Sequence, residues 1–172
     1  MRLFTALCFD DETKNALFSA AKEAEKSAEG KFSLMENYHL TLVFIGETER
    51  REDMEKALSA IDFPSFDYRL SGLGTFDKGI FWAGTERNEN LQNLYKIIKQ
   101  KLDEIGIETE EREFIPHVTL ARKFLPEKNF DFSKIEELLP GKTVKADRIS
   151  LMKSERDEGV LRYTEIYSKK LL

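Results

Sequence analysis

The only two histidines of the 172-residue chain, His39 and His117, lie in matching tetrapeptides. The first is His39-Leu-Thr-Leu and the second is His117-Val-Thr-Leu, and each lies in an apolar run that predicts a buried strand. Side chains alternate between the two faces of a strand, so each motif places an imidazole and a threonine hydroxyl on one face. If the two strands are neighbours, both imidazoles converge on one site together with Thr41 and Thr119.

Such a pair of imidazoles predicts general acid and base catalysis. With an ordinary pKa of about 6.5, one ring can accept a proton while the other donates one near neutral pH. Displacement at phosphorus suits this arrangement, because the base deprotonates the attacking hydroxyl while the acid protonates the leaving oxygen. The hydroxyls of Thr41 and Thr119 would then donate hydrogen bonds to the non-bridging oxygens, which carry negative charge in the transition state. This chemistry requires no metal.

Two other roles for the histidines compete with this one. A metal site needs more than two imidazoles, and the sequence has no His-x-x-x-His pair and no second cysteine. A single His-x-Thr is also compatible with a histidine that fills a half-buried structural position, but two such motifs at matching positions favour a functional pair. Cys8 lacks any recognisable nucleophile context and is predicted to be a small buried hydrophobe.

A shift of 78 residues relates the two motifs and also the segments around them. It takes the strand that starts at Arg2 to the one that starts at Ile80, and it takes Leu73 to Leu151. Each half then has the order strand, helix, histidine strand, helix, strand, as an internal duplication would leave it. We therefore expect one domain over residues 1–172, made of two repeated halves at about 1–78 and 79–172.

The individual elements follow from apolar spacing and from helix start and stop signals. Strands are expected at 2–9, 38–46, 66–73, 80–85, 114–120, 144–153 and 160–168. Helices are expected from Asp10 and Asp11 to about residue 28, with Gly30 as the stop, and at about 48–60 and 91–105. A short last helix is expected from Ser133, with Glu136 completing a capping box, to Pro140. The turn Asp77-Lys78-Gly79 should join two strands.

The composition limits the partners and the compartment. A formal charge of −5 argues against a protein that coats long nucleic acid, but it allows binding of one short phosphorylated end. Basic residues near the second motif and the end of the chain could form a local positive pocket or a solvated surface: Arg122, Lys123, Lys153, Arg156 and Arg162. No apolar run approaches the roughly 18–20 residues that span a bilayer. The single cysteine and the absence of a signal peptide predict a protein of the reducing cytoplasm.

The motifs resemble those of a known family. The two His-x-Thr-Leu motifs, the opening Arg2-Leu-Phe-Thr-Ala, the phrase Phe114-Ile-Pro-His-Val-Thr-Leu-Ala-Arg122 and Ser154-Glu-Arg ahead of Tyr163 are similar to the two-histidine phosphoesterases. Within these the chain looks most like the RNA 2′,3′-cyclic phosphodiesterases, also named 2′-5′ RNA ligases (LigT-like), over essentially its whole length. The resemblance implies a bilobal α+β fold in which two βαβαβ-type halves, related by a pseudo-twofold axis, line a central cleft with their sheets and carry helices outside.

The resemblance also implies an activity. A 2′,3′-cyclic phosphate at an RNA 3′ end, or on a small nucleotide, would be opened to a 2′-phosphomonoester, with reversible 2′-5′ ligation in some members and no cofactor. His39 would be the acid that protonates the departing 3′ oxygen and His117 the base that activates water, while Thr41 and Thr119 hold the phosphate. The protein is expected to be a monomer without membrane association. The alternative is a catalytically silent nucleotide- or RNA-binding module on the same cleft.

The expected substrate-binding role of Arg122 depends on the local shape of its strand. Strict alternation places Arg122 on the face opposite His117, so it reaches the phosphate only if the strand bulges or ends after Thr119. Otherwise it braces the rim of the cleft. Arg156 and Ser154 could contact the nucleotide or lie at the surface, and Phe4 is expected in the core.

Overall fold

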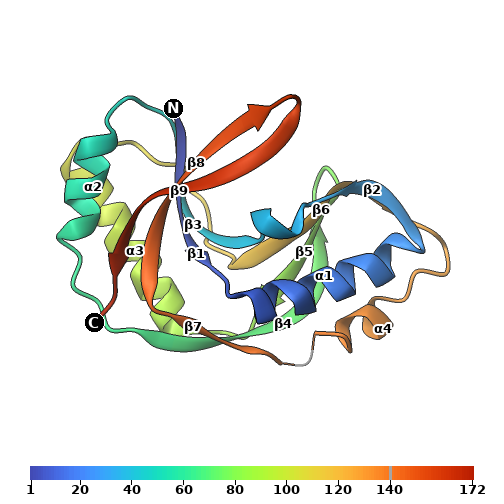
Figure 1. Cartoon of the computed structure of the whole chain (residues 1–172). Helices are drawn as coiled ribbons and strands as arrows, with labels where there is room; N and C mark the ends of the chain where they lie inside the picture. Colours follow the sequence, from blue (N-terminus) through green and yellow to red (C-terminus); the bar gives the residue numbers. More distant parts are fainter. Residues whose placement is uncertain (140) are drawn as a thin grey trace.

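The computed structural model describes residues 1–139 and 141–172 (Figure 1). The elements follow in chain order as β1 (Arg2–Cys8), α1 (Asp11–Glu25), β2 (Ala28–Phe32), the 3₁₀ turn η1 (Met35–Asn37), β3 (His39–Glu47), α2 (Arg51–Ser59), β4 (Phe66–Phe76), β5 (Ile80–Thr85), α3 (Glu89–Glu104), β6 (His117–Pro126), α4 (Phe132–Glu136), β7 (Thr143–Ala146), β8 (Arg148–Asp157) and β9 (Val160–Lys170).

These strands form two antiparallel sheets, and each sheet combines strands from before and after residue 78. The first sheet has the order β3-β1-β8-β9 and the second the order β2-β6-β5-β4-β7. Helices α2 and α3 pack together and contact strands of the first sheet, whereas α1 and α4 contact strands of the second (Figure 1). Beyond this body the hairpin of β8 and β9 projects as a two-stranded arm (Figure 1). This is a mixed α and β fold, as the sequence predicts.

The strand registers reproduce the 78-residue shift. Thr5 of β1 pairs with Leu151 of β8, and Ala83 of β5 pairs with Leu73 of β4. Thr5 and Ala83 are 78 residues apart, and so are Leu73 and Leu151, so the same shift relates one pair to the other. This correspondence supports an internal duplication, although the division of the chain at about residue 78 stays a prediction.

Apolar stripes place the helices as expected. The side-chain oxygen of Asp10 accepts a hydrogen bond from the Thr13 amide at 2.8 Å, which confirms the predicted start of α1. The inward faces of α1, α2 and α3 carry a buried set of apolar residues, Leu17, Ala20, Ala21, Ala24, Met54, Ala57, Leu58, Leu91, Leu94, Ile98 and Leu102. Burial of these stripes fixes the helices on the outer faces of the sheets.

The end of the first helix is predicted wrongly. Helix α1 ends at Glu25, and residues 28–32 form β2, which pairs along β6. Gly30 is needed inside this strand, because a Cβ atom there would lie 3.1 Å from the Arg122 carbonyl oxygen and 3.2 Å from the Phe124 Cα. The strand has no apolar alternation, since its middle residues are exposed, so the pattern on which the prediction rests is missing.

Two later predictions also need correction. The strand expected over 144–153 is two strands, because β7 pairs with β4 in the second sheet while β8 pairs with β1 in the first. The N-cap of α4 is Asp131, whose carboxylate accepts from the Lys134 amide at 3.2 Å, and not Ser133. The predicted end of this helix at Pro140 lies outside the described residues.

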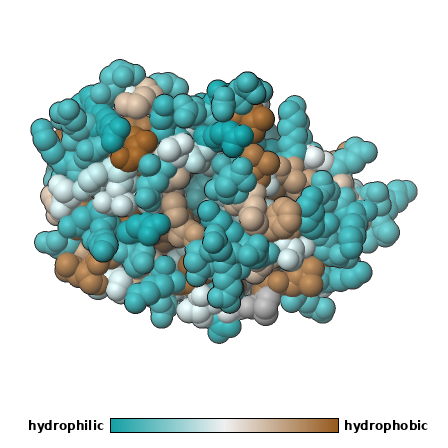
Figure 2. Space-filling model, viewed as in Figure 1, coloured by the Kyte–Doolittle hydropathy of each residue, from teal (hydrophilic) through white to brown (hydrophobic). Residues whose placement is uncertain are grey.

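Hydrophilic side chains cover most of the face seen in Figure 2, and hydrophobic ones form separate patches. Among the helices of residues 1–139 and 141–172, none is long and apolar enough to cross a membrane.

The second histidine strand, expected to end at Leu120, begins at His117 and continues to Pro126. This longer β6 carries Arg122 within the strand.

Candidate active site

The first histidine motif opens strand β3, and two hydrogen bonds fix its imidazole. Nδ1 of His39 lies 2.7 Å from the backbone oxygen of Asn37, and a carbonyl oxygen can only accept, so Nδ1 carries the hydrogen. Nε2 lies 2.9 Å from Oγ1 of Thr41. In the neutral ring the Thr41 hydroxyl therefore donates to Nε2, as expected for an imidazole and a hydroxyl on one strand face.

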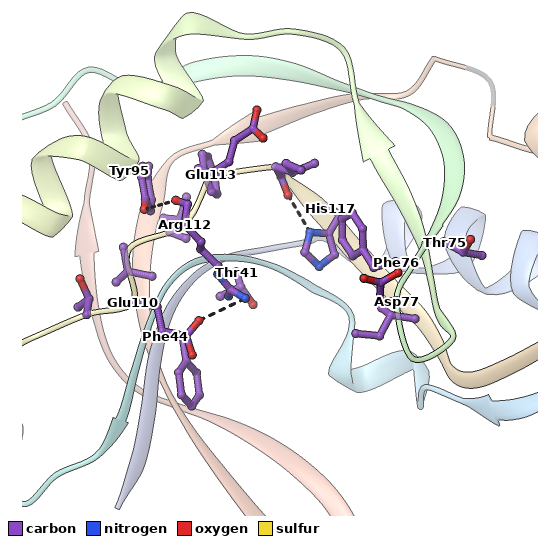
Figure 3. A pocket seen from close by; sticks show the side chains of 16 residues that line it. Thr41, Phe44, Thr75, Phe76, Asp77, Tyr95, Glu110, Arg112, Glu113 and His117 are labelled. Atoms are coloured by element: carbon purple, nitrogen blue, oxygen red, sulfur yellow. Dashed lines mark hydrogen bonds and ion pairs between the residues drawn. The ribbon is translucent and has the colours of Figure 1, made fainter.

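The second motif repeats this geometry at the start of β6. Nδ1 of His117 donates to the backbone oxygen of Ile115 at 2.8 Å, so this ring has the same tautomer and leaves Nε2 for a ligand. Figure 3 shows the ring at the edge of a cavity, beside Phe76 and Asp77. The Phe76 ring meets it edge-on, with 4.9 Å between centroids.

The structure brings the two motifs together. Strands β3 and β6 approach each other although they belong to different sheets. Thr41 and His117 line one cavity of about 480 Å³ (Figure 3). The positive charge of protonated His117 also lowers the pKa of His39. The catalytic roles of these residues stay predictions.

A bulge in β6 decides the position of Arg122. In the pairing of β5 with β6, Phe81 lies opposite Ala121 and Trp82 opposite Thr119, so Leu120 is an extra residue. Leu120 and Ala121 are consequently both buried. Alternation resumes one residue late, which returns residue 122 to the face that carries Thr119.

Arg122 accordingly acts on both imidazoles. Its guanidinium charge lowers the pKa of His39 and the pKa of His117. The condition set by the sequence, a strand that bulges after Thr119, is therefore met. Its contact with a phosphate stays a prediction.

Burial is the largest influence on each imidazole. It lowers the pKa of His39 to about 4, with smaller contributions in the same direction from His117, Arg122 and Lys14. The rings of Phe4 and Tyr163 each lie 4.8 Å from that of His39 and exclude water. Burial also lowers the pKa of His117, and Arg112 adds to this effect. Both rings are therefore mainly neutral at pH 7 in the unliganded protein.

Comparison with known proteins identifies the family. The family model described as the 2′-5′ RNA ligase superfamily matches residues 10–158. The chain belongs to this superfamily. A Thermotoga maritima protein named RNA 2′,3′-cyclic phosphodiesterase is 32% identical over 152 residues, which cover 79% of this chain and 81% of the relative. A Methanocaldococcus jannaschii protein of the same name is 30% identical over 142 residues and 80% of each chain.

Solved structures with the same fold agree with this assignment. The Thermus thermophilus protein TT0787 aligns over 99% of this chain and 97% of its own, with a TM-score of 0.82 and 25% identity. E. coli LigT complexed with 3′-AMP aligns over the same shares, with a TM-score of 0.83 and 22% identity. The LigT-like fold inferred from the two motifs is therefore confirmed.

Three other residues named from the sequence, Thr119, Phe4 and Ser154, lie in different surroundings. Thr119 is half-buried, and its backbone oxygen accepts from the Ser33 hydroxyl at 3.2 Å. Phe4 is buried, as expected, but in a small cluster beside His39. Ser154 pairs with Arg2 across β1 and β8.

The other basic residues do not assemble into the positive pocket that the sequence suggests as one possibility. Lys153 pairs with Glu155 at 2.8 Å, and Arg162 lies 3.6 Å from Glu36. Arg156 donates to the backbone oxygen of Gly159 at 3.1 Å, at the tip of the hairpin arm. Lys123 is exposed. These cations therefore have the solvated surface role that was the alternative.

Sequence reasoning missed the segment between α3 and β6, which forms one wall of the cavity. Arg112 of this segment extends toward Thr41 and Phe44 (Figure 3), and its guanidinium lies 3.4 Å from the Glu110 carboxylate. The lining combines aromatic and charged side chains, among them Phe44, Phe76, Tyr95, Phe114, Asp77, Glu110, Arg112 and Glu113. The one sequence signal was an isolated arginine in the run 108–113, which otherwise holds four glutamates. In the described ranges, no three His, Cys, Asp or Glu side chains form a group that could hold a metal ion.

Proposed function

We propose that this chain is an RNA 2′,3′-cyclic phosphodiesterase that hydrolyses a terminal 2′,3′-cyclic phosphate to a 2′-phosphomonoester. His39 and His117 supply acid and base catalysis without a metal. The observation that carries the proposal is the pair of imidazoles, held in the same tautomer by equivalent backbone carbonyls at the starts of β3 and β6, two strands that contact each other. Superfamily membership and relatives of that name at about 30% identity support it.

The reaction needs one proton removed and one delivered. Water attacks phosphorus and gives a proton to Nε2 of the base, while the bond from phosphorus to O3′ breaks and O3′ takes a proton from Nε2 of the acid. We assign the acid to His39 and the base to His117, following the family resemblance. In each ring the bond from Nδ1–H to a carbonyl aims the other nitrogen at the reacting phosphate.

Three side chains are suited to hold the charge on phosphorus. We propose that Thr41, Thr119 and Arg122 donate hydrogen bonds to the non-bridging oxygens, where charge gathers in the transition state. A guanidinium forms the strongest of these bonds, because donor and acceptor are both charged. When no phosphate is bound, the charge of Arg122 lowers the pKa of both neighbouring imidazoles.

Substrate binding should therefore prepare the acid. A pKa of about 4 leaves His39 neutral near pH 7, so it carries no proton to donate in the unliganded protein. A bound phosphate anion favours the imidazolium form and raises the pKa toward the range that an acid catalyst needs.

The cavity beside His117 is the proposed place for the nucleoside of the RNA end. Its volume of about 480 Å³ lies in the range of small-molecule sites, and Phe44 and Phe76 offer rings on which a base can stack. The related E. coli LigT has been crystallised with 3′-AMP. The substrate class is thus an RNA 3′ end or a small nucleotide that carries the cyclic phosphate. In a reversible 2′-5′ ligation a 5′-hydroxyl would take the place of the attacking water.

We also propose that the chain acts as a monomer, that it works in a reducing cytoplasm, and that its single domain consists of halves at about 1–78 and 79–172. Size-exclusion chromatography with light scattering tests the first of these.

The central test uses a nucleoside 2′,3′-cyclic phosphate in the presence of EDTA, with phosphorus NMR to identify the product. We expect turnover to the 2′-phosphomonoester and a loss of about 10²–10⁴-fold in kcat for His39→Asn or His117→Asn. Gln100→Ala is the control, because this residue lies on the outer side of α3 and bonds only with Glu104 among the described residues. Saturable nucleotide binding without product would instead support the silent binding module.

A further inference from the structure

Asn37 links the two edges of the first sheet. Strands β3 and β9 are the edge strands, and Asn37 lies just before β3. Its side-chain Nδ2 donates to the Leu161 carbonyl at 2.8 Å, and its Oδ1 accepts from the Tyr163 amide at 3.2 Å, both in β9. An edge strand presents unpaired donors and acceptors, and a single amide side chain satisfies one of each. Asn37 therefore occupies the place of a strand neighbour to β9.

The same residue holds the imidazole of His39. While the Asn37 side chain is bound to β9, its backbone oxygen accepts the Nδ1 hydrogen of His39 at 2.7 Å. Tyr163, whose amide binds the Asn37 side chain, packs its ring edge-on against His39 at 4.8 Å and 86°. Asn37 is only 8% exposed, so water competes little for these bonds. The position of β9 is thus tied to the orientation of the catalytic ring.

The second motif lacks this arrangement. There the carbonyl that accepts from His117 belongs to Ile115, whose apolar side chain is 44% exposed and cannot hydrogen-bond. Equivalent positions of the repeat thus differ in one respect: the carbonyl that orients His39 is held by a side-chain amide, and the carbonyl that orients His117 is not. The asymmetry indicates a specific task for the amide.

We propose that Asn37 is a positioning residue for His39: its side-chain amide, anchored on β9, fixes the backbone carbonyl that keeps the imidazole in the Nδ1–H tautomer. The kinetic part of this inference depends on the proposed function. The nearby ion pair between Glu36 and Arg162 also joins η1 to β9, but at 3.6 Å between exposed side chains it contributes little. Asn37 is therefore the residue whose loss should release the ring.

The expected effect is on the chemical step. Without the amide, the Asn37 carbonyl can rotate away, and the imidazole gains both its other tautomer and other ring orientations. A misplacement of about 1 Å in a reacting group can lower the rate by about 10²-fold. We expect Asn37→Ala to lower kcat by about 10–100-fold with little change in KM, because the phosphate ligands on the other motif remain.

Asn88→Ala is a matched control. Asn88 makes the same two kinds of bond in another part of the fold: its Nδ2 donates to the Asp67 carbonyl at 3.0 Å and its Oδ1 accepts from the Leu91 amide at 3.1 Å. Loss of this N-cap should lower the melting temperature, as Asn37→Ala should, but leave kcat unchanged. Comparison of the two variants separates positioning from stability.

The readout that a purely structural role would not move is the tautomer of His39. The chain has two histidines, so a proton–nitrogen NMR spectrum of the rings is assigned with His117→Asn alone. We expect the Nδ1–H form of His39 in the wild type and a mixture of tautomers in Asn37→Ala. Asn37→Asp keeps the acceptor for Tyr163 and loses the donor to Leu161, so it should be intermediate in kcat and in tautomer ratio.

The carboxylate of that variant should also raise the pKa of His39. The groups that contact the ring or act on its pKa are Lys14 of α1, Cys8 of β1, His117 and Arg122 of β6, and Tyr163 of β9, and none of these is a carboxylate. The pH profile of kcat/KM, which reports the unliganded protein, should therefore move to higher pH.

An unchanged tautomer and an unchanged kcat in Asn37→Ala would overturn the inference even if the melting temperature fell. If Asn37→Ala does not fold, Asn37→Asp decides by the same two measurements. If the wild type hydrolyses no cyclic phosphate, the proposed function fails, and the tautomer comparison still tests the positioning role.

Discussion

Phe44 occupies the position after Thr41 that Arg122 occupies after Thr119. In the first motif Ala6 pairs with Thr41 and Thr5 with residue 43, so β3 has one extra residue after the threonine, as β6 does. The third residue after each threonine therefore returns to the imidazole face. Strand β3 places an aromatic ring there, with the Arg2 guanidinium 4.9 Å above it, and β6 places a cation. The site is thus chemically asymmetric although its backbone is repeated.

Removal of the Arg122 charge should change both histidines. The guanidinium lowers the pKa of His39 and of His117, so Arg122→Gln should raise both pKa values in the unliganded protein. It should also lower kcat/KM for a cyclic phosphate by about 10–100-fold, the effect of one hydrogen bond to a charged group. Ring NMR titration measures the first effect and steady-state kinetics the second. Lys123→Gln removes the same charge from the neighbouring exposed position and should change neither; equal effects of the two variants would contradict the assignment.

Apolar spacing predicted most of the fold because it reports burial. Strand β5 occurs at the predicted residues, Ile80–Thr85, and α2 and α3 lie close to the predicted ranges 48–60 and 91–105. Strand β2 was missed for the converse reason: Glu29 and Lys31 are exposed, and the strand exists because the edge of β6 offers it hydrogen bonds. No local pattern encodes a partner nearly 100 residues away.

The residues of the site were likewise predictable from the sequence only where the signal is local. The two His-x-Thr motifs were visible because their residue types and repetition are local facts. The bulge that turns Arg122 toward His117 could be stated only as a condition, since it depends on the register against β5. The bonds from Asn37 to β9 span more than 120 residues of sequence and follow only from the curvature of the first sheet.

The pH dependence of catalysis follows from the direction of the two pKa shifts. The active form has one imidazole protonated and the other neutral, and it is most populated between the two pKa values of the pair. Since both values lie below 6.5 in the unliganded protein, kcat/KM should be maximal below pH 6.5 and fall as the pH rises. The profile of kcat should lie at higher pH, because bound phosphate stabilises the imidazolium. Both are measured between pH 4 and 9, and a kcat/KM optimum above pH 7 would contradict the shifts.

A side chain at Gly79, in the turn between β4 and β5, should destabilise the fold. This residue has φ +70°, and a Cβ atom there would lie 2.9 Å from the Phe124 amide nitrogen. Gly159, in the turn of the hairpin arm, has φ +81° but no atom within 4 Å of such a Cβ, so Gly159→Ala isolates the cost of the left-handed backbone, about 1 kcal/mol. Gly79→Ala should cost a further 1–3 kcal/mol, roughly, for the collision. Urea unfolding compares the two, and equal losses would show that the contact with Phe124 is not tight.

His39 should make the fold less stable in acid. Its pKa is about 4 in the folded protein and about 6.5 in the unfolded chain. Between these two pH values the unfolded chain binds a proton that the folded chain does not bind. The neutral ring costs nothing above pH 6.5; the penalty grows as the pH falls and is complete below pH 4, at roughly 3 kcal/mol. Carboxylates also titrate in this range, so the measured quantity is the difference between the wild type and His39→Asn in unfolding free energy at pH 7 and at pH 4.5. We expect the variant to gain stability relative to the wild type on acidification, and a difference that is independent of pH would show that His39 titrates normally in the fold.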